Sequence, residues 1–392
     1  MNKTETSNQF SDQEKLARLQ LMRTDGVGPV LFRALIEKFG SGTQAIEGAV
    51  ELSKINGRKR PLSPPSLQAC EAELDQIERF GARVLFLGTA PYPERLAATD
   101  DAPPVLLVKG NTEHLASLSV GIVGARNASA AGMKFTSQIA AKLAEAKVTI
   151  VSGLARGIDT AAHQASLKAG TIACVAGGLD IHYPPENKAL QEKIADIGLL
   201  VSEMPLGTRP QARHFPRRNR LISGLSDGVL VVEAAIKSGS LITARFAAEQ
   251  GRDVFAVPGA PLDPRARGGN RLIKDGAILV ESAEDILAEL RPWQDQWAPE
   301  GHTKGTTEER AHITPAIGPK ECPSPAQFQS VVPRDGGTDL LSFLSDTPIH
   351  VDDIVRLSGA PADEVLSSFL ELELAGKITR HSGGRVSRIY GE

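Results

Sequence analysis

Seven short apolar runs recur between residues 120 and 281, and helical stretches separate them. Each run is mostly apolar along its length rather than alternating, which is the pattern of strands buried on both faces of a sheet. Strands that alternate with helices predict an α/β fold with a doubly wound parallel sheet. A further segment at 83–110 precedes the runs and is expected to add strands at one edge. The runs are residues 120–124, 148–152, 171–176, 198–202, 228–233, 253–259 and 277–281.

Smaller segments flank this block, so the chain is expected to contain several domains. Its 392 residues suffice for two or three domains with a large core. The linker prediction rests on a stretch rich in proline, glycine and polar residues, without periodicity. The predicted units are an N-terminal helical domain (1–73), the α/β domain (74–290), a flexible linker (291–337) and a C-terminal domain (338–392).

In the N-terminal segment, Gly26 and Gly28 separate two amphipathic helical patterns. Two interpretations of this turn stand. The simpler one is a short corner between helices that uses glycine for its turn. The other is a turn that presents backbone N–H groups at a helix start to a nucleic-acid phosphate.

The C-terminal segment shows three short helical patterns and a hairpin that turns at 382–384, which predicts a winged helix. The third helix would read a duplex, but its segment is acidic and lacks lysine and arginine, so it should repel phosphates. We therefore favour protein contact or structural support, while the basic wing leaves weak contact with a DNA backbone open. The acidic residues are Asp363, Glu364, Glu371 and Glu373, and the basic ones are Lys377, Arg380, Arg385 and Arg388.

Bulk composition bounds the cellular setting more than the function. The net charge of −3 says little about partners. The cysteines Cys70, Cys174 and Cys322 form no C-x-x-C pair, which favours a reducing compartment. The polar N-terminus is no signal peptide, and no apolar run approaches the about 18 residues of a membrane span. A cytoplasmic protein without membrane contact is expected.

Positive charge is concentrated at 204–226, which holds five arginines, one histidine and no carboxylate. In an open α/β sheet, ligands bind at the carboxyl ends of the strands, and this stretch follows the fourth run. Glycine-rich loops follow the neighbouring runs and let the chain pass close to a ligand. Arginines for phosphates and an aromatic ring for a base together indicate a nucleic-acid strand. The other loops are 124–129, 152–159, 177–180 and 234–240.

Several other chemistries find little support. No G-x-G-x-x-G follows the first run and no P-loop motif occurs, so no cofactor is expected. The histidines lack the spacing of metal ligands, so no metal is expected. Asp159 and His163 are interpreted as helix capping and packing, because no nucleophile is near. Glu203 and Glu233 could act as general acids or bases, but we favour a role as anchors for Arg218 or Arg220. No catalytic residue is predicted.

A series of motifs runs through the central block in a fixed order: VGIVGAR, IVSGLARGIDTAAH, GGLDIHYPPEN, SEMPLG, HFPRRNRLISGLSDGVLVVEA, SGSLITA, GRDVFAVPG and GGNRLIKDGA. Across about residues 85–285 this series closely resembles the DprA (Smf, DNA-processing A) family. The resemblance implies a Rossmann-like domain that binds single-stranded DNA and forms homodimers through residues near 255–280, between SAM-like and winged-helix domains. It also implies a protein that protects incoming strands and loads RecA during natural transformation, without enzymatic turnover.

The resemblance also implies roles for single residues. Phe215 would stack on a base, with Arg218, Asn219 and Arg220 near the phosphates. Arg126 looks like a second phosphate-binding arginine. Arg156 is either a third or a residue that holds its own loop, and the 238–244 turn closes the pocket. The predicted DNA-binding residues are Gly124, Arg126, Ser129, Gly153, Arg156, Arg213, His214, Phe215, Arg217, Arg218, Asn219, Arg220, Ser238 and Ser240.

Two rival functions stay open. The first is a Rossmann-like enzyme that binds or hydrolyses nucleotides, since phosphoribohydrolases place a threonine after a glycine-rich turn with a glutamate nearby. Here the 238–244 turn with Glu233 upstream is a loose echo of that arrangement. The second is an adaptor whose basic rim binds an acidic protein.

Overall fold

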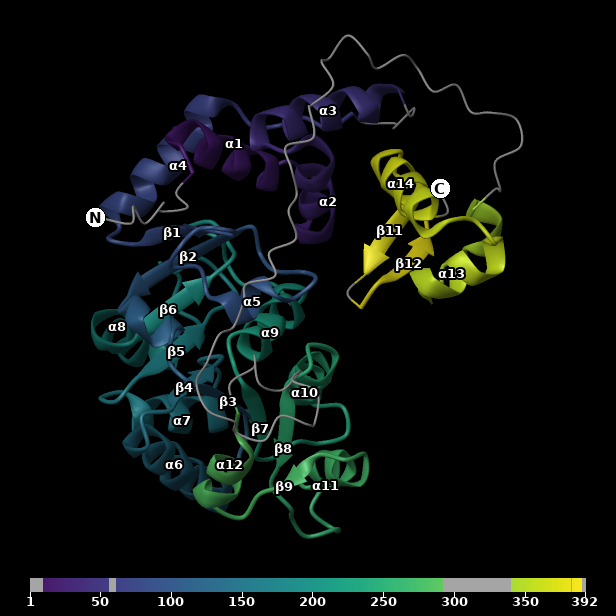
Figure 1. The fold of residues 1–392 in the computed structure, drawn as a ribbon. Helices are drawn as coiled ribbons and strands as arrows, with labels where there is room; N and C mark the ends of the chain where they lie inside the picture. Colours follow the sequence, from purple (N-terminus) through teal and green to yellow (C-terminus); the bar gives the residue numbers. More distant parts are fainter. Residues whose placement is uncertain (1–9, 56–60, 292–339, 382, 390–392) are drawn as a thin grey trace, which may run out of the picture.

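The computed structural model describes residues 10–55, 61–291, 340–381 and 383–389 (Figure 1). Apart from its first residue, the predicted linker at 291–337 lies outside this part of the chain. The described residues contain a nine-stranded sheet in the order β1-β2-β6-β5-β4-β3-β7-β8-β9. The strands are β1 (Arg83–Phe86), β2 (Val105–Gly110), β3 (Ser119–Val123), β4 (Thr149–Ser152), β5 (Thr171–Cys174), β6 (Leu199–Ser202), β7 (Gly228–Val231), β8 (Asp253–Ala256) and β9 (Ile278–Leu279).

The predicted doubly wound sheet is confirmed, with β3 to β9 paired in parallel in the places of the seven apolar runs. Every residue of β3 to β7 is buried, as strands covered on both faces require. The preceding segment supplies β1 and β2 at one edge, as predicted. Strand β2 runs antiparallel to both of its neighbours.

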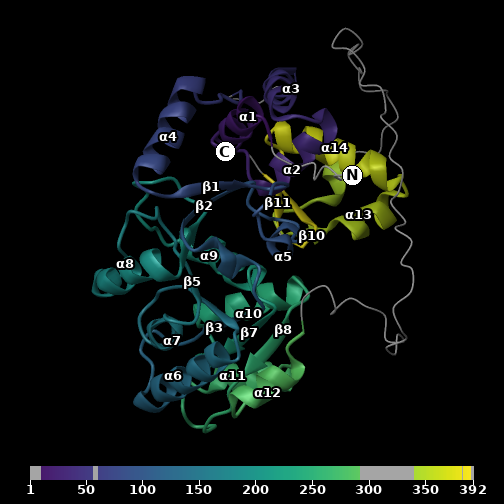
Figure 2. The ribbon, with the colours of Figure 1, turned by 60° about the vertical axis from the view of Figure 1, so that its left-hand side comes forward.

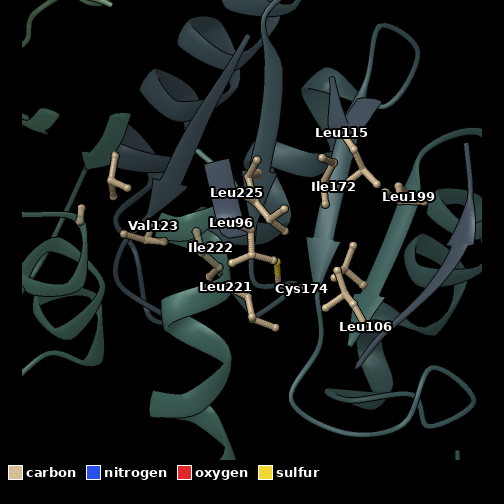
Figure 3. Close-up of a cluster of buried hydrophobic side chains, with 14 of the residues drawn as sticks. Leu96, Leu106, Leu115, Val123, Ile172, Cys174, Leu199, Leu221, Ile222 and Leu225 are labelled. Atoms are coloured by element: carbon tan, nitrogen blue, oxygen red, sulfur yellow. The ribbon is translucent and has the colours of Figure 1, made fainter. Parts of the chain in front are cut away.

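Helices cover both faces of the sheet. On one face, α9 and α10 pack over Val229 and Val231 of β7. Figure 3 shows Leu221 and Ile222 of α9 in this cluster. On the other face, α6, α7 and α12 pack over Leu230 and the neighbouring strands. Side chains of β7 alternate between the two cores, as the pleat dictates. The central helices are α5 (Glu94–Ala97), α6 (Ala130–Glu145), α7 (Ile158–Ser166), α8 (Lys188–Ile197), α9 (His214–Gly224), α10 (Gly239–Glu249), α11 (Arg267–Lys274) and α12 (Ala283–Glu289), with 3₁₀ turns η1 (Thr112–Leu115) and η2 (Pro185–Asn187).

The order in which the chain adds parallel strands to the sheet switches sides at β3. From β3 the chain moves to β4, β5 and β6 on one side, and α9 then carries it back to β7 on the other side. Helices α6 and α10, which follow β3 and β7, therefore lie on opposite faces. A crevice between the carboxyl ends of two such strands is where open α/β sheets bind ligands.

The N-terminal domain is helical, as predicted. Gly26 takes a φ of 86° in the turn before α2, a backbone conformation that favours glycine. Gly28 is the N-cap of α2 and Pro29 its first residue. This geometry fits the short corner, and contact of the turn with DNA stays a prediction. The helices are α1 (Asp12–Met22), α2 (Pro29–Phe39), α3 (Gly42–Ile55) and α4 (Leu67–Arg79).

The C-terminal domain is a winged helix, as predicted. The prediction for its first helix is wrong in type, because the structure has a single 3₁₀ turn there. The wing, β11 and β12, pairs antiparallel as predicted. Leu370 and Leu374 of α14 share an apolar cluster with Leu31 and Leu35 of α2, and Figures 1 and 2 show the two domains side by side. This contact is structural support within the chain, whereas contact of the third helix with another protein stays a prediction. The elements are η5 (Leu340–Phe343), β10 (Ile349–His350), α13 (Val351–Ser358), α14 (Ala362–Leu374), β11 (Ile378–His381) and β12 (Arg385–Arg388).

Basic wing residues are partly used within the protein. Arg380 forms an ion pair of 3.2 Å with Glu373 of α14. Arg385 approaches Glu249 of α10 at 3.7 Å. These contacts leave less free charge on the wing than its sequence indicates. None of the helices in the described ranges has the length and apolarity needed to cross a membrane.

Candidate functional site

Two adjacent hollows open at the carboxyl ends of β3, β4, β5 and β7, beside the start of α9. The first has a volume of about 400 Å³ and the second about 450 Å³. Loops far apart in the sequence form both. Segments 126–127, 153–156, 175–177, 181–185, 210 and 215–218 contribute to the first. Segments 123–126, 155–159, 212–222 and 238–243 contribute to the second.

Arg126 and Phe215 line both hollows. The Arg126 guanidinium carbon lies 5.1 Å from the centre of the Phe215 ring, a cation–π contact. Tyr183 packs against Phe215, with the two ring centres 5.6 Å apart and the ring planes tilted by 54°. Arg126 and Tyr183 are exposed and Phe215 is half-buried. A flat, partly cationic surface therefore borders the two hollows.

Arg218 also lines both hollows, but it is buried. Its Nη1 donates a hydrogen bond of 3.1 Å to the Cys174 carbonyl, and its Nε is buried without a hydrogen-bond partner among the described residues. A Cβ on Gly153 would lie 1.5 Å from Nη1, so the guanidinium occupies the space that only glycine leaves open. Burial lowers the pKa of Arg218, while the nearby carboxylate of Asp159 opposes that shift.

Asp159 organises the loop after β4. Its carboxylate accepts hydrogen bonds from the amides of Gly153 at 3.1 Å and Ala155 at 3.3 Å. Burial raises the pKa of Asp159, although the positive charge of Arg218 counteracts this. His163 instead pairs with Thr171 at 2.7 Å, and burial lowers its pKa to about 3. Asp159 and His163 therefore have separate hydrogen-bond partners and do not pair with each other, which agrees with the packing roles expected for them.

Arg220 does not lie where the sequence analysis expected it. Its guanidinium is buried in an ion pair with Glu203 and lies 3.7 Å from Asp101, so it is not offered to a phosphate. Glu203 also approaches Arg217 at 3.4 Å. The expectation that Glu203 anchors an arginine is thus confirmed. The buried pair fixes α9 against the body of the domain, which sets the direction of the other arginines.

Glu233 was expected to anchor an arginine and instead holds Ser129. It accepts hydrogen bonds from the Ser129 amide at 2.9 Å and from its hydroxyl at 2.5 Å. Ser129 in turn caps α6 by accepting from the Gly132 amide. Gly124 packs directly against Ile158 of α7, because a Cβ there would lie 2.6 Å from that side chain. Ser129 and Gly124 shape the loop after β3, and Gly124 also lines the second hollow.

The turn after β7 closes the second hollow. Ser238 caps α10 and its hydroxyl lies 2.6 Å from that of Ser240, and both residues line the hollow. Asn219 donates to the Gly239 carbonyl at 3.2 Å and also lines it. These predicted residues are brought together, although each already has a partner inside the protein.

Arg156, Arg213 and Arg217 lie exposed near the hollows. Arg156 pairs with Glu186 of the loop after β5, which favours its loop-holding role while leaving it on the lining of the first hollow. His214 is buried. Its burial lowers its pKa, and the positive charges of Arg213 and Arg217 lower it further. Its Nδ1 accepts from the Gln211 amide at 3.3 Å, so it shapes the start of α9.

Tyr183 was missed as a site residue, together with Asn127 and Pro210. All three line the first hollow. The usable signal was an aromatic residue in a loop directly after a buried strand, within the quoted motif IHYPPEN. Within the described part of the chain, no three His, Cys, Asp or Glu side chains are grouped so that they could hold a metal ion.

A family model described as DNA recombination-mediator protein A matches residues 83–291. The chain belongs to the DprA/Smf family. Models described as a DprA-like N-terminal HHH domain and a DprA winged helix domain match residues 12–75 and 325–384.

Relatives support the membership over most of the chain. Protein Smf of Escherichia coli is 40% identical over 81% of this chain and 81% of its own. Protein Smf of Synechocystis is 33% identical over 97% of this chain and 100% of its own. The crystal structure of Streptococcus pneumoniae DprA, 36% identical, matches with a TM-score of 0.60 over 72% of this chain and 99% of that one. Helicobacter pylori DprA, described for its single-stranded DNA binding mode, is 32% identical with a TM-score of 0.49, over 53% of this chain and 95% of that one.

Proposed function

We propose that this member of the DprA/Smf family is a single-stranded DNA-binding recombination mediator. The observation that carries the proposal is the Arg126–Phe215 contact on the border of two hollows. A ring for stacking and a guanidinium for phosphate, at the ligand-binding edge of the sheet, are what a nucleic-acid strand needs. Exposed Arg213 extends the positive charge around that edge, and Arg156 and Arg217 add to it although Glu186 and Glu203 offset part of their charge.

A single strand suits the hollows better than a duplex. The bases of a duplex are stacked and paired, so a ring in a hollow can reach them only in an unpaired strand. The third helix of the winged helix packs Leu370 and Leu374 against the N-terminal domain, and its segment is acidic and lacks lysine and arginine, so it should repel the phosphates of a duplex. Duplex DNA should therefore compete poorly.

The finer proposal follows the family: in the cytoplasm the protein protects incoming strands and helps load RecA during natural transformation. It acts as a homodimer through residues near 255–280. Leu262 and Leu279 are 89% and 44% exposed in that region, and a partner subunit would cover them. Light scattering of the wild type and of Leu279→Asp tests the dimer, since the particle mass in solution should fall by half in the variant. RecA-dependent strand exchange with and without the protein tests the loading step.

The rival enzyme reading finds less support. Glu233, its candidate carboxylate, accepts two hydrogen bonds from Ser129 and so serves the loop before α6. We propose no catalytic turnover. Nucleoside monophosphates incubated with the protein should release no free base, and steady release abolished by Glu233→Gln would overturn this.

The direct test is fluorescence anisotropy with labelled oligo-dT across a salt series, with duplex competitor. Arg126→Ala should weaken binding about tenfold. It should also reduce the slope of log affinity against log salt concentration by about 1, as expected for the loss of one phosphate contact. Lys142→Ala is the matched control. It removes an exposed lysine that pairs with Glu284 near the far end of α6. Equal effects of both substitutions, or competition by duplex, would contradict the proposal.

A further inference from the structure

Arg33 of α2 connects the N-terminal domain to one segment of the central domain. Its Nη2 donates hydrogen bonds to the carbonyl oxygens of Ala97 at 3.2 Å and of Thr99 at 3.0 Å. Both carbonyls lie at the end of α5, and the last carbonyl groups of a helix have no partner within it. Arg33 therefore fixes the chain where it leaves α5, at the start of a bridge segment that comprises residues 97–103.

The bridge segment is also held by α9. The guanidinium of Arg220 donates to the Asp101 carbonyl, and its Nε lies 3.7 Å from the Asp101 carboxylate. A Cβ on Gly224, at the end of α9, would lie 2.6 Å from Leu96 and 3.7 Å from Thr99, so the helix backbone packs directly on α5 and the segment. Figure 3 shows Leu96 among the apolar side chains of α9. The same few residues thus contact Arg33 on one side and α9 on the other.

Helix α9 carries the side chains that face the two hollows. Phe215 and Asn219 line them, and Arg220 directly follows Asn219 in the chain. Because helix geometry fixes the spacing of these residues, a displacement at Arg220 also displaces Phe215 and Asn219. A helix that is already held in its binding position lowers the ordering cost when a strand binds.

Attachment of the N-terminal domain does not depend on Arg33. Leu19 of α1 and Cys70 and Ile77 of α4 share a buried apolar cluster with Phe86 of β1 and Leu107 of β2. This packing already fixes the domain on the edge of the sheet. The hydrogen bonds of Arg33 therefore act on the bridge segment rather than on the docking of the whole domain.

We propose that Arg33 is a positioning residue for DNA binding, which holds the bridge segment, and through it Arg220 and α9, in the arrangement that binds the strand. The N-terminal domain thus raises the affinity of the sheet edge without a contact between Arg33 and DNA. This inference rests on the proposed function and extends the site to a residue of another domain.

The first test is anisotropy with labelled oligo-dT across a salt series, using the full chain. Arg33→Met removes the donors but keeps an apolar stem, and it should weaken binding about fivefold without changing the salt slope. Arg33→Lys, which can still donate, should restore part of the affinity. Lys38→Met is the matched control, because it removes the same charge from an exposed position in the last turn of α2. Its binding should stay within about twofold of wild type.

A second variant acts on the bridge segment from the α9 side. Asp101→Asn removes a negative charge near the site, so electrostatics alone would tighten DNA binding. The positioning role predicts the reverse, a loss of about fivefold. Because Arg33 and Asp101 act on one segment, the double variant should lose less than about twofold beyond either single variant. Asp101→Asn also keeps the proposal testable if Arg33→Met does not fold.

Hydrogen exchange gives a readout that needs no DNA. In Arg33→Met, the amides of 97–103 and 214–224 should exchange faster, while those of α1 and α4 should not change because their apolar packing remains. Unchanged exchange in α9, an equal loss of binding in Lys38→Met, or a reduced salt slope in Arg33→Met would each overturn the positioning role. Failure of the wild type to bind oligo-dT would remove the proposed function, and exchange in α9 would still decide whether Arg33 holds that helix.

Discussion

The guanidinium of Arg126 lies over the ring of Phe215 at 5.1 Å, and the two residues are about 90 positions apart in the chain. Arg126 lies in the loop after β3, and Phe215 lies in the first turn of α9, which follows β6. The parallel sheet brings these two segments together. The pair is therefore a product of the fold that also forms a border of both hollows.

Because they touch, Arg126 and Phe215 should be coupled in DNA binding. Phe215→Ala should weaken oligo-dT binding by about 1–3 kcal/mol through lost stacking. The loss of binding free energy in the double variant Arg126→Ala/Phe215→Ala should be smaller than the sum of the two single losses by about 0.5–1 kcal/mol. Titrations of the four proteins measure this coupling. Strict additivity would mean that the contact has no part in binding.

Gly153 should tolerate no side chain. A methyl group in Gly153→Ala would collide with Arg218, which cannot withdraw because it is buried. Binding of oligo-dT should fall at least tenfold. Gly239→Ala is the control, since its added carbon meets nothing within 4 Å although the residue lines the second hollow. Its binding should stay within twofold of wild type, and a loss equal to that of Gly153→Ala would refute the steric explanation.

The buried ion pair of Glu203 and Arg220 should matter for stability. Glu203→Ala leaves the Arg220 charge buried without this partner and should cost about 3–5 kcal/mol of the free energy of unfolding of the central domain. Glu186→Ala breaks the exposed pair with Arg156 and should cost less than about 1 kcal/mol. Chemical denaturation compares the two. Similar midpoints for both variants would argue that the buried pair does not fix α9.

His163 should make the protein less stable in acid. Its folded-state pKa of about 3 lies below the ordinary 6.5, so between these values the unfolded chain binds the proton and the folded one does not. Stability contributed by the neutral ring is therefore present above pH 6.5 and is lost as the pH falls toward 3, by up to about 1.4 kcal/mol per unit. Denaturation between pH 7.5 and 5 should show a shallower pH dependence for His163→Gln than for wild type. Parallel curves would contradict this.

The elements that could be predicted are those whose burial gives a regular pattern of apolar residues along the chain. The strands were predictable because burial on both faces makes each run apolar throughout, as in β3 and β7. The edge of the sheet where ligands bind follows from strand direction alone. Positions of side chains along one helix turn were not predictable, since neither Arg218 nor Arg220 shows by its identity that it is buried.

Roles that depend on a distant partner were predicted only in part. Glu203 was expected to anchor Arg218 or Arg220 and does pair with Arg220, whereas Glu233 binds Ser129 rather than an arginine. Tyr183 escaped notice because a single aromatic residue in a loop has no period to mark it. Its contact with Phe215 exists only once the loop after β5 and α9 are placed together.

The most direct test of the account is photocrosslinking with an oligonucleotide that carries 5-iododeoxyuridine, followed by mass spectrometry of the joined peptides. The base should crosslink to Tyr183 or Phe215, and excess unlabelled oligo-dT, but not duplex, should suppress the product. Crosslinks confined to the turn at Gly26 and Gly28, or to the wing of the C-terminal domain, would contradict binding at the sheet edge.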